Sequence, residues 1–215
     1  MIGFLKGLRR RLTTDVRSNW SRQWAKDDYR PHWMIDAIPQ PVEAAVSDGF
    51  FAPGCSIIEF GCGQGEIAAF FADKGHRVVA LDIAPPAIER ARRRYGDAPA
   101  SPHFLAGDVC RKLPIDDAFD CAFDRGCYHT LRSATERSAY LRNLLSILKP
   151  SGRFLLLHKT AFREECTPEV EARVRDELME DLERHFSLIA WEGVQMSPHG
   201  ERVMMGIAMR LQRSA

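Results

Sequence analysis

The stretch from residue 57 to residue 82, IIEFGCGQGEIAAFFADKGHRVVALD, constrains the fold more than any other part of this chain. An apolar run ends in Glu59, a turn with three glycines follows, and a second apolar run ends in Asp82. This order is typical of a strand, a tight turn, a helix and a second strand. It predicts an α/β chain with a Rossmann-like, doubly wound sheet.

The glycine turn also predicts a ligand, because ligands of such sheets lie at the carboxyl ends of the strands. Gly61, Gly63 and Gly65 let the backbone turn tightly and approach a ligand where a side chain would collide. Asp82 ends the next strand, where a carboxylate can accept hydrogen bonds from a ribose diol. We therefore expect a cofactor that contains a nucleoside.

The glycine spacing differs from the dinucleotide fingerprint G-x-G-x-x-G/A. The third glycine comes one residue early, and Glu66 stands where the fingerprint has a small residue. A carboxylate at the amino end of a helix competes with an anionic pyrophosphate for the positive end of the helix dipole. Glu59 and Glu66 suit a cationic ligand better, so a dinucleotide-dependent oxidoreductase is the less favoured alternative.

Further motifs follow the glycine turn in order. The segment FLAGD ends in Asp108, LP at 113–114 precedes AFD at 118–120, and LKPSGR at 148–153 leads into apolar FLLL. Together with the glycine turn, these segments resemble class I S-adenosylmethionine-dependent methyltransferases from residue 57 to residue 157. Ser151 stands where the family has a second glycine.

The resemblance implies S-adenosyl-L-methionine as the cofactor and S-adenosyl-L-homocysteine as the product. It makes Glu59 the acid of the first motif, and it places Ile83 against the adenine ring and Asp108 at the adenine amino group. The cofactor-binding residues that we expect are Glu59, Gly61, Cys62, Gly63, Gly65, Asp82, Ile83, Asp108, Val109 and Asp124.

The resemblance and the apolar periodicity together predict a seven-stranded, mostly parallel sheet with an antiparallel last strand and an amino-terminal helical lid. We expect the lid or cap at residues 1–45 and the S-adenosylmethionine-binding domain at 46–215. The expected strands are 55–60, 77–82, 102–106, 118–124, 153–159, 186–192 and 202–211. The expected helices are 41–48, 64–74, 84–95, 136–148 and 168–184.

Composition narrows the class of protein. The 215 residues carry a net charge of +1, so we expect no broad basic surface and no nucleic-acid partner. No apolar run approaches the ~20 residues that span a bilayer, and no secretory signal is evident. The six cysteines form no C-x-x-C pair, which favours reduced thiols, no metal and a cytoplasmic location. The oligomeric state stays open.

The first twelve residues, MIGFLKGLRRRL, allow two interpretations. Apolar and basic residues alternate as in a short interfacial helix, which would make this a peripheral-membrane lipid or quinone methyltransferase. Alternatively the segment is a frayed or lid-forming chain end. We favour the second interpretation, because one short basic helix anchors a membrane weakly.

The residues that face the transferred methyl group are expected after the fourth strand, in FDCAFDRGCYHTL at 119–131. His129 is the first candidate general base near neutral pH, and His158 is the second. Asp124 can contact the cationic end of the cofactor, orient the base, or merely cap the next helix. A base is not obligatory, because alignment alone can contribute ~7–11 kcal/mol.

The acceptor is expected to be a small molecule with a sulfur, oxygen or nitrogen nucleophile. The segment FDRGCYHTL, with DGFFAPG at 48–54 and the tryptophan-rich front piece, resembles the thiopurine and halide/thiol branch of the family, which implies a soft or aromatic acceptor. Ordinary lid packing of the tryptophans and a catalytically inactive cofactor-binding partner are the alternatives. The acceptor-binding residues that we expect are Trp20, Trp24, Trp33, Arg125, Tyr128 and His129.

Overall fold

The computed structural model describes residues 18–31, 33–34, 37–96, 100–199 and 202–214. The first twelve residues, and with them the choice between a membrane helix and a lid, lie outside the described residues. Residues 18–24 are helical. The elements that follow are α2 (Gln40–Ser47), β1 (Ser56–Phe60), α3 (Glu66–Asp73), β2 (Arg77–Asp82), α4 (Pro85–Tyr95), β3 (His103–Ala106), β4 (Phe119–Arg125), the short 3₁₀ turn η1 (Tyr128–Thr130), α5 (Ala134–Ile147), β5 (Leu148–Phe162), α6 (Pro168–Leu182), β6 (Phe186–His199) and β7 (Arg202–Arg213).

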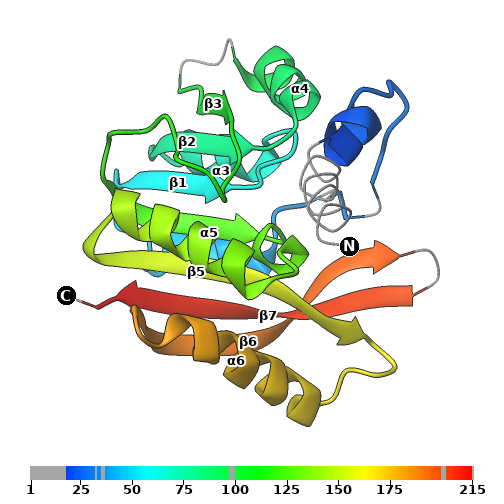
Figure 1. Ribbon diagram of the computed structural model, residues 1–215, viewed down its shortest axis with the longest axis vertical. Helices are drawn as coiled ribbons and strands as arrows, with labels where there is room; N and C mark the ends of the chain where they lie inside the picture. The colour runs from blue at the N-terminus through cyan, green and yellow to red at the C-terminus, as the bar shows by residue number, and fades with distance from the viewer. Residues whose placement is uncertain (1–17, 32, 35–36, 97–99, 200–201, 215) are drawn as a thin grey trace, which may run out of the picture.

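The strands form one seven-stranded sheet in the order β3-β2-β1-β4-β5-β7-β6 (Figure 1). β7 runs antiparallel to both of its neighbours, whereas the other pairs are parallel. The predicted sheet, mostly parallel with an antiparallel last strand, is confirmed. β1 pairs with β2 on one side and with β4 on the other, so the strand order reverses there. The crevice at the carboxyl ends of β1 and β4 is where this fold binds ligands.

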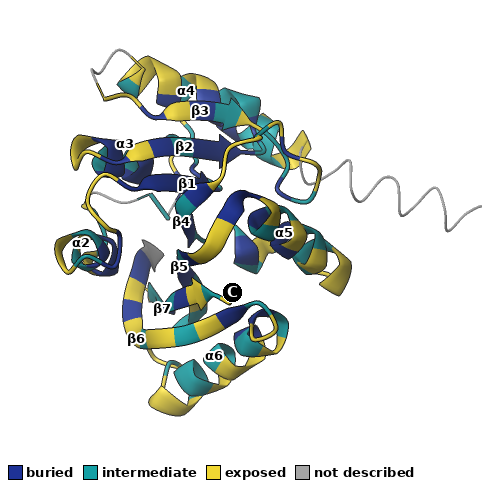
Figure 2. Ribbon diagram, turned by 90° about the vertical axis from the view of Figure 1, so that its left-hand side faces the viewer, coloured by how far each residue is buried: buried dark blue, intermediate teal, exposed yellow. Residues whose placement is uncertain are grey.

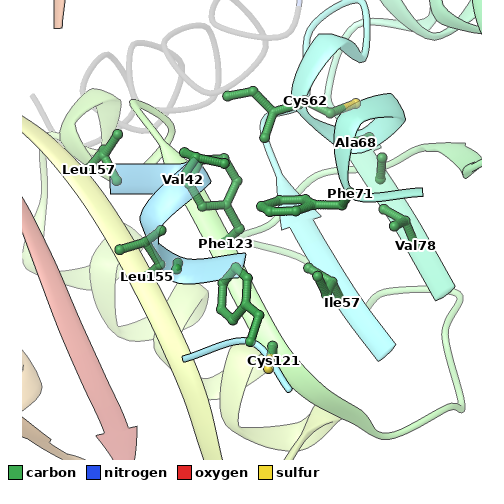
Figure 3. Close-up of a cluster of buried hydrophobic side chains, with 14 of the residues drawn as sticks. Val42, Ile57, Cys62, Ala68, Phe71, Val78, Cys121, Phe123, Leu155 and Leu157 are labelled. Atoms are coloured by element: carbon green, nitrogen blue, oxygen red, sulfur yellow. The ribbon is translucent and has the colours of Figure 1, made fainter. Parts of the chain in front are cut away.

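Helices cover both faces of the sheet, with α2 and α3 on one face and α5 and α6 on the other (Figure 2). All five residues of β1 are buried, because alternate side chains point to opposite layers. Ile57 packs in the layer of α2 and α3 with Phe71 and Phe123, whose rings lie 5.4 Å apart (Figure 3). Ile58 packs in the layer of α5 and α6.

The segment from residue 18 to the end of α2, called the front piece below, shares part of this core with the sheet. Val42 and Ala45 of α2 are fully buried in the same cluster as Ile57 and Phe71. The expected division into a cap at 1–45 and a domain at 46–215 stays a prediction. In the structure, however, α2 packs against one face of the sheet as part of the helical layer that covers it.

Two strands are longer than the sequence predicts. β5 continues to Phe162, and β6 to His199, because each pairs with the long antiparallel β7. Residues 160–162, which follow the expected strand 153–159, therefore belong to β5. At the other end of β5, Ser151 has φ +61°, the left-handed conformation that explains why glycine is usual at this position in the resembled family.

Candidate active site

The glycine turn joins β1 to α3 in the conformation that the sequence predicts. Gly61, Gly63 and Gly65 have φ of +73°, +56° and +85°. A Cβ at Gly61 would lie 2.6 Å from Cβ of Cys127, and one at Gly65 would lie 2.5 Å from the Phe104 ring. Side chains at these two positions are therefore excluded by packing as well as by backbone conformation.

Acidic side chains converge around this turn. Glu59 and Asp82 are almost completely buried near the carboxyl ends of β1 and β2. Asp82 accepts hydrogen bonds from the backbone N–H of Gly63 at 2.9 Å and of Ala84 at 2.8 Å, so it fixes the loop on both sides. Burial raises the pKa of Asp82 to about 6.

Glu59 is the least satisfied of these acids. Its Oε2 is buried and has no hydrogen-bond partner among the described residues. Burial, with the nearby carboxyls of Glu66, Asp124 and Asp82, raises the pKa of Glu59 to about 8. The crevice thus holds a buried carboxyl oxygen without a hydrogen-bond partner among the described residues, which is costly unless a ligand supplies one. The nearby Arg125 guanidinium lowers the pKa of Glu59, but by less than burial and the other carboxyls raise it.

Asp124 caps the turn that follows β4, which is one of the roles that the sequence leaves open for it. Its side chain is fully buried, and it accepts hydrogen bonds from the N–H of Cys127 at 2.8 Å, the N–H of Tyr128 at 3.0 Å and the hydroxyl of Tyr140 at 2.7 Å. Burial raises the pKa of Asp124 to about 7. These bonds fasten the segment after β4, which carries His129. The expected contact of Asp124 with the cofactor stays a prediction.

The remaining residues expected at the cofactor lie in the glycine turn and in the loops that follow β2 and β3. Asp108 accepts a hydrogen bond from the N–H of Cys110 and pairs with Arg111 at 3.3 Å, so its carboxylate shapes the loop after β3. Val109 is buried in the layer of α5, and Cys62 is buried in the glycine turn. Ile83, directly after β2, is half-buried and open to a ligand contact.

The two candidate bases lie side by side. The rings of His129 and His158 are 5.5 Å apart and nearly perpendicular. Nδ1 of His129 is buried without a hydrogen-bond partner among the described residues, whereas Nδ1 of His158 lies 2.7 Å from the carbonyl oxygen of Lys159. Burial lowers the pKa of His129 to about 3 and that of His158 to about 4. Both imidazoles are neutral at pH 7, and both are weaker bases than the sequence predicts.

Arg125 connects parts of the chain that the sequence does not bring together. Its guanidinium donates to the carbonyl oxygens of Trp33 at 3.1 Å and Met196 at 2.6 Å, which links the front piece to β6. Its Nε is buried without a partner among the described residues. Tyr128 donates its hydroxyl to Asp181 of α6 at 3.0 Å. The hydroxyl of Tyr128 is thus engaged, and its ring lies 6.5 Å from that of His158.

The aromatic front piece covers the glycine turn. Trp24 is 5 % exposed, packs with Ala84 and Ala87, and would lie 3.5 Å from a Cβ at Gly63. Trp20 and Trp33 make an edge contact with ring centroids 5.5 Å apart. Of the three tryptophans expected over the acceptor, Trp24 therefore lies against the expected cofactor site.

Sequence reasoning missed several residues beside this turn. A cavity of about 550 Å³ is lined by residues of the front piece, the glycine turn and α4. The signal that could have found its arginines is the run of basic residues along α4. The cavity is lined by Asp27, Tyr29, Arg30, Met34, Gln64, Glu66, Arg90, Arg93 and Arg94.

Comparison with known proteins agrees with this geometry. Residues 57–152 match the model of a family described as a methyltransferase domain. This segment is a class I S-adenosylmethionine-dependent methyltransferase domain. The resemblance inferred from the sequence motifs is confirmed, and so is S-adenosylmethionine as the cofactor of the domain.

The curated relatives of this domain have names that refer to different methyl-transfer reactions. A malonyl-[acyl-carrier protein] O-methyltransferase of Serratia marcescens is 32% identical over 53% of this chain and 42% of its own length. A 2-heptyl-1-hydroxyquinolin-4(1H)-one methyltransferase of Mycobacteroides abscessus is 26% identical over 62% of this chain and 59% of its own. The chain thus spans about half the length of these curated relatives.

A solved structure shows the same fold over nearly the whole chain. It is the 1,6-didemethyltoxoflavin-N1-methyltransferase of Burkholderia thailandensis with bound S-adenosylhomocysteine, which aligns with a TM-score of 0.72 and 24% identity. The alignment covers 96% of this chain and 90% of that chain. The methyltransferase fold therefore extends beyond residues 57–152 into β6 and β7.

Two further findings concern the described part of this chain. No group of three or more His, Cys, Asp or Glu side chains there is arranged to hold a metal ion. No helix in that part is long and apolar enough to cross a bilayer.

Proposed function

We propose that this chain transfers the methyl group of S-adenosylmethionine to a small-molecule acceptor by in-line displacement at sulfur, oxygen or nitrogen. The observation that carries the proposal is the buried Oε2 of Glu59, which has no hydrogen-bond partner among the described residues and lies beside the glycine turn and two further buried acids. S-adenosylmethionine carries a sulfonium and an ammonium group, and when bound it supplies the reactive methyl.

The charge of the crevice supports this cofactor over a dinucleotide. Glu59, Asp82 and Asp124 are buried there, and Glu66 opens α3. An anionic pyrophosphate at this helix end would meet these carboxyls, whereas a cationic ligand would ionise Glu59 and compensate its charge. We assign Glu59 to the cationic end of the cofactor and Asp82 to its ribose.

The acceptor lies, in this proposal, beside the His129 and His158 pair. A neutral imidazole nitrogen without a partner can accept a hydrogen bond from an N–H, O–H or S–H of the acceptor. A base whose pKa is about 3 removes a proton only weakly, so acceptors that are already acidic are favoured. The names of the Mycobacteroides and Burkholderia proteins refer to small-molecule acceptors, which supports that substrate class.

Calorimetric titration tests the proposal directly. The purified chain is titrated in parallel with S-adenosylmethionine, S-adenosylhomocysteine and NADH. We expect micromolar binding of the first two and none of NADH, and binding of NADH alone would overturn the assignment. Thiols, phenols and nitrogen heterocycles are then screened by mass spectrometry for a gain of one methyl group. Cofactor binding without turnover on any acceptor would favour the inactive partner.

A further inference from the structure

A second group of reactive side chains lies at the amino ends of the strands, on the edge of the sheet opposite the glycine turn. Cys55 directly precedes β1, His76 directly precedes β2, and Cys121 lies near the start of β4. The Sγ atoms of Cys55 and Cys121 are 3.6 Å apart, and Sγ of Cys55 lies 3.3 Å from Nδ1 of His76. Cys121 lies at one end of the core cluster in Figure 3.

A cavity gives small molecules access to these sulfurs. Its volume is about 470 Å³, and Cys55 and Cys121 both line it. The two cysteines are only 7 % and 3 % exposed, so a large reagent cannot reach them. Lys149 and Arg153 line the same cavity, and Lys149 forms an ion pair with Asp120 at 2.7 Å. A small polar molecule can therefore approach the thiols through a cavity that Lys149, Arg153 and the Asp120 carboxylate all line.

The surroundings of Cys55 favour its thiolate, which is the reactive form. The contact with the Cys121 thiol, its largest influence, lowers the pKa of Cys55. The charge of Arg153 also lowers this pKa, whereas burial and the Asp120 carboxylate raise it, and the pKa is lowered on balance. Burial lowers the pKa of His76, so its imidazole is neutral at pH 7 and can take a proton from the adjacent thiol. A disulfide has an S–S bond of about 2.05 Å, so the sulfurs must approach by about 1.5 Å to bond.

We propose that Cys55 and Cys121 are a dithiol that hydrogen peroxide oxidises to a disulfide between β1 and β4. The Cys55 thiolate attacks one peroxide oxygen, the O–O bond breaks, and the released hydroxide takes the proton from His76 and leaves as water. The sulfur of Cys121 then attacks the sulfenic acid on Cys55, the S–O bond breaks, and a second water forms. Two thiols lose two electrons and two protons, and the peroxide is reduced to two waters.

The other cysteines lack this arrangement. In the described structure, Sγ of Cys62 contacts the carbonyl oxygen of Gly63, and Sγ of Cys110 contacts that of Glu136. Cys166 contacts a hydroxyl and a carboxylate rather than a second sulfur. Cys127 lies near Cys110, and burial together with the charge of Cys110 raises the pKa of the Cys127 thiol, but Sγ of Cys110 contacts the carbonyl oxygen of Glu136. Among the described residues, Cys55 and Cys121 are the cysteines whose sulfurs are in contact, so we expect the oxidation at this pair.

Peptide mapping of the full chain tests this proposal. The reduced protein is treated with a modest excess of hydrogen peroxide, its free thiols are alkylated, and the digest is analysed by mass spectrometry. We expect two of the six thiols to be lost, one linked peptide that contains Cys55 and Cys121, and full recovery with dithiothreitol. Retention of all six thiols, or a link between any other pair, would overturn the proposal.

Variants test the order of the two steps. In Cys121→Ser, the sulfenic acid on Cys55 has no resolving thiol, so dimedone should label Cys55. In Cys55→Ser, dimedone should leave Cys121 unlabelled, and labelling there would contradict the assigned roles. Cys166→Ser is the matched control and should form the linked peptide as the unmodified chain does. If a variant fails to fold, the linked peptide of the unmodified chain still decides the proposal.

Discussion

Replacing Glu59 with glutamine tests two effects of this buried acid: a lower free energy of unfolding and a higher affinity for the cofactor. Glu59 is 3 % exposed, and its Oε2 has no partner among the described residues. Its pKa rises from an ordinary value of 4.5 to about 8 on folding. The folded protein therefore binds this proton more tightly than the unfolded chain. The free energy of unfolding falls as the pH rises from about 4.5 to about 8.

The size of the effect follows from the shift. A separation of about 3.5 pH units at 1.36 kcal/mol per unit corresponds to about 5 kcal/mol over the whole range. About 3 kcal/mol of this is lost between pH 5 and pH 8. Glu59→Gln has no ionisable group, so its unfolding free energy should fall about 3 kcal/mol less over that interval. Its affinity for S-adenosylmethionine should nevertheless decrease, because the cation loses its counter-charge.

Urea unfolding at pH 5, 6.5 and 8, without cofactor, measures the difference. Glu89→Gln is the matched control, because Glu89 is exposed on α4 and should keep the pH dependence of the unmodified chain. Calorimetry with S-adenosylmethionine supplies the second readout. If Glu59→Gln showed the same pH dependence of unfolding as the unmodified chain, the conclusion that burial raises the pKa of Glu59 would be refuted. Unchanged cofactor affinity would remove Glu59 from the cationic end of the cofactor.

Three further predictions concern single residues. Asp82→Ala should weaken S-adenosylhomocysteine binding at least tenfold in calorimetry while circular dichroism stays native, and unchanged affinity would remove Asp82 from the ribose site. His129→Ala should lower turnover about tenfold through the lost hydrogen bond to the acceptor, with little change in cofactor affinity. If turnover survives, alignment alone carries the rate. Gly65→Ala places a Cβ 2.5 Å from the Phe104 ring at φ +85°, so it should destabilise the fold by about 2 kcal/mol or more in urea, and a native midpoint would contradict that packing.

The sheet was predictable because its signals are local. Buried parallel strands are continuous apolar runs, and β1 and β2 end where the acids Glu59 and Asp82 come near the crevice. Strand length is not local, since β5 reaches Phe162 only through pairing with Met204 of β7. A polar segment such as residues 159–162 therefore looks like a loop until its partner strand is known.

The sequence predicts which segments supply the candidate site residues, but not the contacts that these residues make. Asp124 was proposed for the cofactor, yet it accepts three hydrogen bonds from the segment that follows it and from Tyr140. The basicity of His129 depends on burial by distant segments, which the motif around it does not contain. The contacts of Arg125 with Trp33 and Met196 join residues far apart in the chain. No spacing rule reveals such contacts.

The burial of the acids links cofactor binding to folding. Glu59, Asp82 and Asp124 each have a pKa raised by burial, so each ionised carboxyl destabilises the cofactor-free protein near neutral pH. A cationic ligand that binds only the folded state reverses part of this effect and stabilises the fold by mass action. The front piece adds to the coupling, because Trp24 packs beside the glycine turn and Arg125 holds the carbonyl of Trp33. Under the proposed assignment of Glu59 to the cationic end of the cofactor, part of the cofactor affinity therefore comes from relieving the unfavourable burial of these acids in the unliganded fold.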